Sequence, residues 1–167
     1  GKPWAFQHYG ITPDIFSFGK KSQQCGIMAG PRIDQVPNNC FEMSSRINST
    51  WGGNLVDMVR ATKILETIKN DSLCSNAAKQ GEKWLTEMTQ MAANFDMIDN
   101  VRGKGLIMAF DTPNAETRDK VIGSMFDNGM IGLSSGERTV RFRPHLAVTS
   151  DDVSRALEIT EAALKTL

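Results

Sequence analysis

The sequence Pro13-Asp14-Ile15-Phe16-Ser17-Phe18-Gly19-Lys20-Lys21 contains a short apolar run that a proline opens and a glycine closes. The length of the run, its aromatic content and its flanking residues predict a buried strand that ends in a tight turn. Lys20 follows the glycine directly, so such a turn holds an amine at the edge of a core. A lysine in this position is most often a solvated surface residue, because an ammonium group favours water. The rest of the sequence must therefore decide whether Lys20 has a chemical role.

The composition is that of a globular chain. Of the 167 residues, 40% are apolar and 23% are charged, which separates the chain from disordered sequences. Lysine plus arginine equals aspartate plus glutamate, at 19 each, so no net charge favours nucleic acid or an anionic membrane. No apolar run reaches the roughly 18 residues of a spanning helix. We therefore expect neither nucleic acid nor a membrane as a partner.

Cysteines and histidines are few and scattered. The three cysteines, Cys25, Cys40 and Cys74, form an odd set, which argues against a disulfide framework and indicates a reducing, cytoplasmic location. The two histidines, His8 and His145, do not lie at metal-ligand spacing from a cysteine or from each other. We therefore expect no metal site.

The first part of the chain reads as strands and loops that lead into a long helix. The expected elements are strands at 15–18, 27–29 and 41–43, a loop with a short helical turn at 31–39, and a helix at 55–70. Residues 44–54 are dense in hydroxyls, amides and glycine, so the backbone there can approach a ligand closely. A connecting turn that caps the next helix through Asn54 is the alternative.

The second part reads as a compact unit of helices and strands. The expected elements are helices at 75–95 and 115–128, strands at 101–112, 130–133 and 139–143, and a last helix opened by the capping box of Thr149 to Asp152. The last helix is expected to bury Val153, Leu157, Thr160, Leu164 and Leu167. The first part is too short to own a core, so its strands need partners outside this chain.

Four ordered motifs resemble one protein family. Residues 13–21, 48–54, 101–106 and 140–144 are similar to the C-terminal part of class III, fold-type I pyridoxal-phosphate aminotransferases. Most members carry a glycine-rich run after the reactive lysine. Residues 21–26, Lys-Ser-Gln-Gln-Cys-Gly, replace that run here, which resembles the lysine 6-transaminase branch.

The resemblance implies an α/β fold in two parts. Residues 1–70 would be the end of the large cofactor-binding domain, and residues 71–167 the C-terminal α+β small domain. It further implies transfer of the ε-amino group of L-lysine to 2-oxoglutarate, which gives 2-aminoadipate 6-semialdehyde and L-glutamate. Ornithine or 4-aminobutyrate as the donor, and a non-catalytic interaction module that retains the fold, are the alternatives.

The resemblance also assigns roles to residues. Lys20 would bind the pyridoxal 5'-phosphate aldehyde and act as general base and acid, with Lys21 as its main competitor. An amine in that role must lose its proton, which dry surroundings promote. Ser49 and Thr50 would bind the cofactor phosphate, Thr50 across the interface of a homodimer. Asn48 would lie near the α-end of the substrate, unless its amide only bonds its own turn.

Arg141 would bind the α-carboxylate of 2-oxoglutarate and glutamate, because a planar guanidinium can grip a carboxylate with two bonds. Other groups that the family needs would precede Gly1, among them the aspartate that pairs with the pyridinium nitrogen. We therefore expect this chain to be a C-terminal portion that is inactive without the N-terminal portion of the same enzyme.

Overall fold

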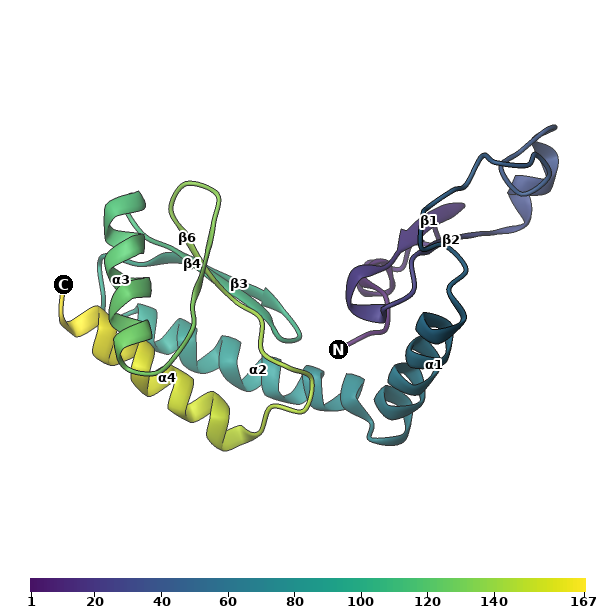
Figure 1. The fold of residues 1–167 in the computed structure, drawn as a ribbon. Helices are drawn as coiled ribbons and strands as arrows, with labels where there is room; N and C mark the ends of the chain where they lie inside the picture. Colours follow the sequence, from purple (N-terminus) through teal and green to yellow (C-terminus); the bar gives the residue numbers. More distant parts are fainter. The chain divides into compact units, whose positions relative to one another are not determined.

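The computed structural model describes residues 1–167, and the chain forms two compact units. The N-terminal unit comprises Pro3–Ser72, and the C-terminal unit comprises Leu73–Leu167 together with Gly1–Lys2. Figure 1 shows the elements of both. No helix has the length and apolar content that crossing a membrane requires. The assignment of residues 1–70 and 71–167 to the large and small domains of an aminotransferase stays a prediction.

The N-terminal unit contains a two-stranded antiparallel sheet of β1 (Ile15–Phe18) and β2 (Gly26–Ala29). Its other elements are η1 (Ala5–His8), η2 (Lys20–Ser22), η3 (Pro31–Gln35) and α1 (Leu55–Asn70). The register pairs Phe18 with Gly26, and the Phe18 ring fills the space in which a side chain at Gly26 would lie. The expected strands at 15–18 and 27–29 and the helix at 55–70 are thus confirmed.

The prediction that the first strand is buried is wrong within this chain. Ile15 is 48% exposed, and the only buried residues of the N-terminal unit are Asn39 and Ala61. The strand lies in a sheet of only two members, which leaves much of its surface uncovered. The expectation that this part owns no core is confirmed.

The strand expected at 41–43 is also wrong. These residues form a turn, because the backbone N–H groups of Glu42 and Met43 both donate to the carbonyl of Asn39 at 3.1 Å. The Asn39 side chain fixes this geometry, since it donates to the carbonyls of Ile33 and Val36 and accepts from the Phe41 N–H. Local amide bonding of this kind competes with strand pairing.

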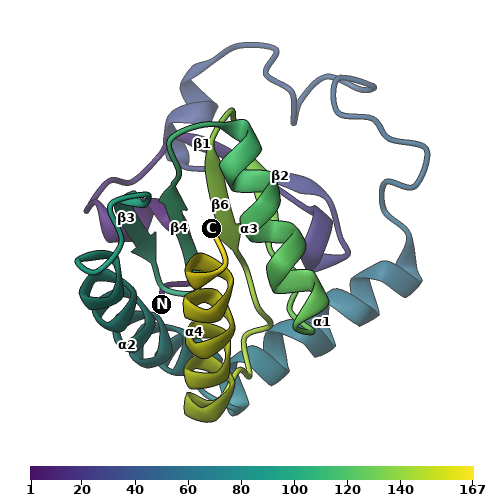
Figure 2. The same cartoon turned by 90° about the vertical axis from the view of Figure 1, so that its left-hand side faces the viewer.

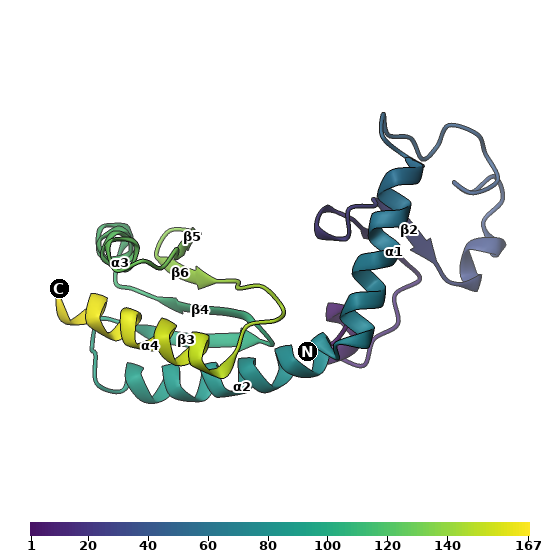
Figure 3. The ribbon, with the colours of Figure 1, turned by 60° about the horizontal axis from the view of Figure 1, so that its bottom comes forward.

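The C-terminal unit is a four-stranded antiparallel sheet with helices on one face. The strand order is β3-β4-β6-β5, formed by Asp99–Lys104, Ile107–Asp111, Thr139–Phe142 and Leu133–Ser135. The helices are α2 (Leu73–Ala92), α3 (Ala115–Asp127) and α4 (Ser150–Lys165). Figure 2 shows these helices in front of the strands, and Figure 3 shows α2 and α4 along the same side of the sheet.

The core of this unit lies between the sheet and its helices. Its fully covered members include Met88, Met108, Phe110, Val121, Met125, Val140, Val153 and Leu164. The predicted capping box at the start of α4 is present, with Thr149 accepting from the Asp152 N–H and Asp152 accepting from the Thr149 N–H. Four of the residues expected to be buried on α4 are buried, but Leu167 is 45% exposed because α4 ends at Lys165.

Several boundaries differ from the expected ones. The strand expected at 101–112 is a hairpin of β3 and β4, because Gly105 turns the chain in the left-handed region with φ +56°. The strand expected at 130–133 lies instead at Leu133–Ser135. The helix expected at 75–95 runs from Leu73 to Ala92.

Candidate active site

Lys20 begins a short turn with an uncommon backbone conformation. Its φ is +61°, and Gln23 at the end of the turn has φ +67° and ψ −23°. The Gln23 N–H donates to the Lys20 carbonyl at 3.2 Å, and the Ser22 hydroxyl donates to the Gln24 carbonyl at 2.9 Å. Left-handed residues other than glycine are few in proteins and concentrate at functional sites. Lys21 has no such φ, so the backbone distinguishes the two lysines.

The turn is packed closely against its own hairpin. A Cβ added at Gly19 would lie 2.7 Å from the Cys25 Sγ atom, so a larger residue immediately before Lys20 would force the Cys25 side chain to move. Helix α1 also contacts η2. The position from which the Lys20 side chain emerges is therefore defined by β1, β2 and α1.

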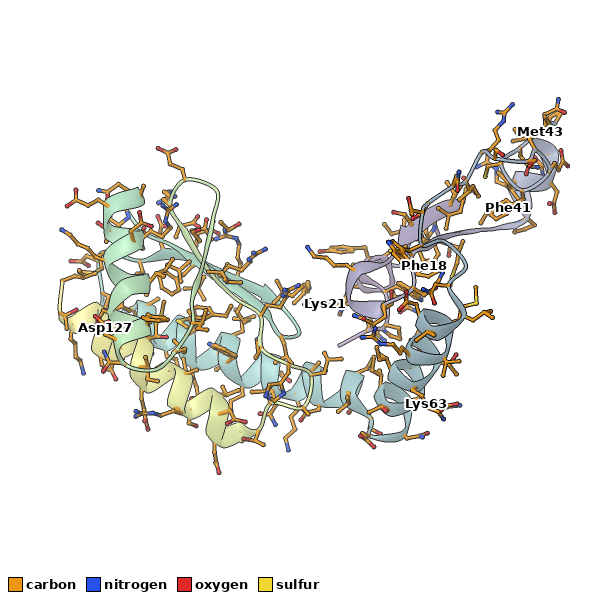
Figure 4. The ribbon with its side chains drawn as sticks, viewed as in Figure 1. Phe18, Lys21, Phe41, Met43, Lys63 and Asp127 are labelled. Carbon is orange, nitrogen blue, oxygen red and sulfur yellow. The ribbon has the colours of Figure 1, made fainter.

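The Lys20 side chain is exposed and takes part in no hydrogen bond or ion pair. The dry surroundings expected for this amine are therefore not supplied by the N-terminal unit itself. Figure 4 shows the neighbouring Lys21 in the turn after Phe18, where it is also exposed. The amine is available to a ligand, and whatever excludes water from it must come from outside this unit.

Asn48, Ser49 and Thr50 lie in an exposed segment before α1. The Ser49 carbonyl accepts from the Gly52 N–H at 2.9 Å, while the Asn54 side chain accepts from two N–H groups of the first turn of α1. The side chains of residues 48–50 form no hydrogen bond, so the Asn48 amide does not bond its own turn. Their hydroxyl and amide groups are free to bind a ligand, and a phosphate accepts from such donors.

Arg141 lies in β6, opposite Ala109 of β4 on one side and Leu133 of β5 on the other. Its Nε atom is buried without a hydrogen-bond partner, and its guanidinium forms no ion pair. Buried polar groups are nearly always paired, so an unpaired one calls for an explanation. A carboxylate ligand bound to the guanidinium would provide the missing acceptor.

A buried carboxylate near Arg141 was not found from the sequence. The Asp111 side chain, at the end of β4, is 9% exposed and forms ion pairs with Arg102 at 3.0 Å and Arg138 at 3.7 Å. Burial alone would raise the pKa of Asp111, but hydrogen bonds from Thr139, Asn100 and Arg102 lower it to about 2. In the sequence, the only indication of these ion pairs is that both strands of the hairpin around Gly105 carry charged residues.

The predicted site residues are divided between the two units. Lys20, Asn48, Ser49 and Thr50 belong to the N-terminal unit, and Arg141 belongs to the C-terminal unit. No group of three or more histidine, cysteine, aspartate or glutamate side chains is arranged to hold a metal ion. The chemistry available is thus that of an amine, hydroxyls, an amide and an unpaired guanidinium.

Comparison with known proteins shows which family this chain resembles. The sequence profile described as aminotransferase class-III matches residues 1–164. The L-lysine-epsilon aminotransferase of Streptomyces clavuligerus is 44% identical over 160 residues, which cover 95% of this chain and 35% of that protein. A mitochondrial 4-aminobutyrate aminotransferase from Sus scrofa is 32% identical over 149 residues, covering 87% of this chain and 29% of that protein.

A solved structure agrees with the fold. Lysine aminotransferase from M. tuberculosis in the internal aldimine form superimposes with a TM-score of 0.92 and 43% identity. The match covers 98% of this chain and 38% of that structure. The chain therefore spans a little more than a third of the length of the lysine aminotransferases that it matches.

Proposed function

This chain belongs to the class III aminotransferase family, and on that premise we propose that it is the C-terminal portion of an enzyme that moves the ε-amino group of L-lysine to 2-oxoglutarate. The products are 2-aminoadipate 6-semialdehyde and L-glutamate. One observation carries the choice of donor: identity is 44% with a lysine-epsilon aminotransferase but 32% with a 4-aminobutyrate aminotransferase.

The residues of this chain fit the cofactor of the family. When bound, pyridoxal phosphate supplies an aldehyde that takes up the amino group and a ring that withdraws electrons. Lys20 Nζ would hold the aldehyde of the bound cofactor, and as a free amine it would move a proton at the substrate carbon that carries the amino group, first as base and then as acid. The amine of Lys20 and the hydroxyls of Ser49 and Thr50 are not engaged by other groups of the chain, which supports this role.

Ser49 and Thr50 bind the cofactor phosphate through their hydroxyls. Thr50 does so in the site of a second subunit, so the enzyme is a homodimer in which each site uses residues of both copies. The exposed position of residues 48–50 supports such a role. Asn48 contributes its free amide near the α-end of the substrate.

Arg141 binds the α-carboxylate of 2-oxoglutarate and glutamate with two parallel hydrogen bonds. The unpaired guanidinium supports this role, because it lacks any carboxylate from the chain itself. The N-terminal portion of the enzyme supplies the remaining groups around the cofactor, so the chain alone does not catalyse transamination. Three free cysteines support a reducing, cytoplasmic location.

The direct test is an assay of the whole enzyme with 2-oxoglutarate and three donors in parallel: L-lysine, L-ornithine and 4-aminobutyrate. We expect the highest kcat/KM with L-lysine. A higher value with either other donor would move the enzyme to another branch of the family. Failure of the whole protein to bind pyridoxal phosphate would favour a non-catalytic module that kept the fold.

A further inference from the structure

The sheet face that carries Arg141 also carries other charged side chains, and these are paired with one another. Side chains alternate between the two faces of a strand, and Val140 and Phe142 of β6 point into the core. The opposite face therefore holds Arg141 and, two residues earlier, Thr139. Across the sheet Ala109 pairs with Arg141, and Arg102 pairs with Ala109 on the other side. Arg102 and Arg141 are thus two strands apart in one row.

Asp111 lies on this face, diagonal to Arg141, because it is paired with Thr139. Diagonal neighbours of a sheet are about 7–8 Å apart, within reach of a long side chain. Arg141 is thus close enough to Asp111 to form an ion pair with it. The structure shows no such pair, although Arg141 has no other ion-pair partner within this chain.

The reason is that both oxygens of Asp111 are already occupied. Oδ1 accepts from Arg102 Nη1 at 3.0 Å and from the Thr139 hydroxyl at 2.6 Å. Oδ2 accepts from Asn100 Nδ2 at 2.8 Å and lies 3.7 Å from Arg138 Nη2. A carboxylate with this set of donors gains little from another cation.

We propose that Arg102 is a positioning residue that keeps Arg141 free for the dicarboxylate substrate by holding Asp111. The inference rests on the proposed function, in which Arg141 binds 2-oxoglutarate. Without Arg102, the buried Asp111 loses its nearest cation and keeps only Arg138, 3.7 Å away, and a buried carboxylate that has lost a charge partner is costly. Arg141 has no ion-pair partner within this chain, so it turns to Asp111, whose carboxylate then competes with the substrate for the guanidinium.

The substrates differ in their need for Arg141. 2-Oxoglutarate carries a carboxylate on the carbon next to its reacting carbonyl, whereas the ε-carbon of L-lysine has no carboxylate beside it. Loss of Arg102 therefore weakens the binding of 2-oxoglutarate and leaves the binding of L-lysine unchanged. A variant that only destabilises the fold would not change the KM of one substrate and leave that of the other unchanged.

The experiment compares Arg102→Met, Asp111→Asn and the double variant in the whole enzyme. The readouts are the KM values for 2-oxoglutarate and L-lysine and the Kd of glutarate, an unreactive dicarboxylate, measured by calorimetry. Arg102→Met should raise the glutarate Kd and the KM for 2-oxoglutarate about three- to tenfold, the range of one ordinary hydrogen-bonded contact. The KM for L-lysine should not change.

Asp111→Asn removes the competing charge at nearly constant shape, so it should retain the wild-type glutarate Kd even though the protein becomes less stable. The double variant should recover the wild-type Kd. Equal glutarate affinity in Arg102→Met and wild type would overturn the inference, as would equal weakening in Arg102→Met and Asp111→Asn. If wild-type enzyme does not bind glutarate, or Arg141→Met binds it equally well, the proposed function fails instead.

Discussion

Gln23 closes the lysine turn by donating its backbone N–H to the carbonyl of Lys20 at 3.2 Å, with both residues in the left-handed region. Glycine adopts this conformation without strain, whereas a β-branched residue rarely does. The turn that presents the amine therefore depends on which residue stands at position 23.

The first prediction follows from that dependence. Gln23→Val should destabilise the enzyme by about 1–2 kcal/mol, while Gln23→Gly should stay close to wild type in urea unfolding. The neighbouring Gln24→Val is the control, because no left-handed φ is found at Gln24. Equal losses in Gln23→Val and Gln24→Val would show that the conformation at Gln23 does not matter.

Asp111 should give the enzyme an acid-dependent stability. Its pKa in the folded protein is lowered from 3.8 to about 2, so the stabilisation is complete above about pH 5 and declines as the pH falls toward 2. A shift of this size corresponds to about 2 kcal/mol. Asp111→Asn should lose about that amount at pH 7, and its difference from wild type should narrow toward pH 2. Urea unfolding across this range measures it, and a constant difference would contradict the account.

Thr50 should affect cofactor affinity through its hydroxyl. Thr50→Val has nearly the same shape but no donor, so the Kd for pyridoxal phosphate should rise roughly 10-fold or more, as expected for a bond to a charged group. Thr50→Ser keeps the hydroxyl and should stay within a few-fold of wild type. Fluorescence titration of the enzyme freed of cofactor gives both values. An unchanged Kd in Thr50→Val would remove the hydroxyl from the phosphate site.

Arg141 should matter for one substrate only. Arg141→Lys keeps the charge but loses the planar pair of donors, so the KM for 2-oxoglutarate should rise roughly 10- to 100-fold with little change for L-lysine. Arg143→Lys is the matched control, since Arg143 is exposed and lies one residue beyond β6. A similar rise in both variants would show that the effect is not specific to the guanidinium of Arg141.

The elements predicted well are those whose signals are local. Helix α1 carries an apolar stripe and an Asn54 cap, and α4 carries the capping box of Thr149 and Asp152. Each signal lies within a few residues of the element that it defines. The turn at Phe41–Met43 was missed because the Asn39 side chain reaches back to carbonyls that the local sequence pattern does not reveal.

In the candidate site, too, residues with a local sequence signal could be predicted and contacts between distant residues could not. Lys20 and Arg141 could be proposed from the sequence because the first follows a strand pattern and the second lies within one, each in a family motif, and their roles stay predictions. The hydrogen bonds around Asp111 join residues 9, 11 and 28 positions apart in sequence, and they exist only once β3, β4 and β6 have paired. The left-handed φ of Lys20 could not be predicted either, since the residue is not glycine.

The central claim is that the Lys20 amine holds the cofactor aldehyde. Treatment of the whole enzyme with borohydride should link pyridoxal phosphate covalently to the amine that binds it, and peptide mapping then identifies the lysine. The account predicts the label on Lys20, together with loss of the label in Lys20→Ala and its retention in Lys21→Ala. A label on Lys21, or on neither lysine, would contradict it.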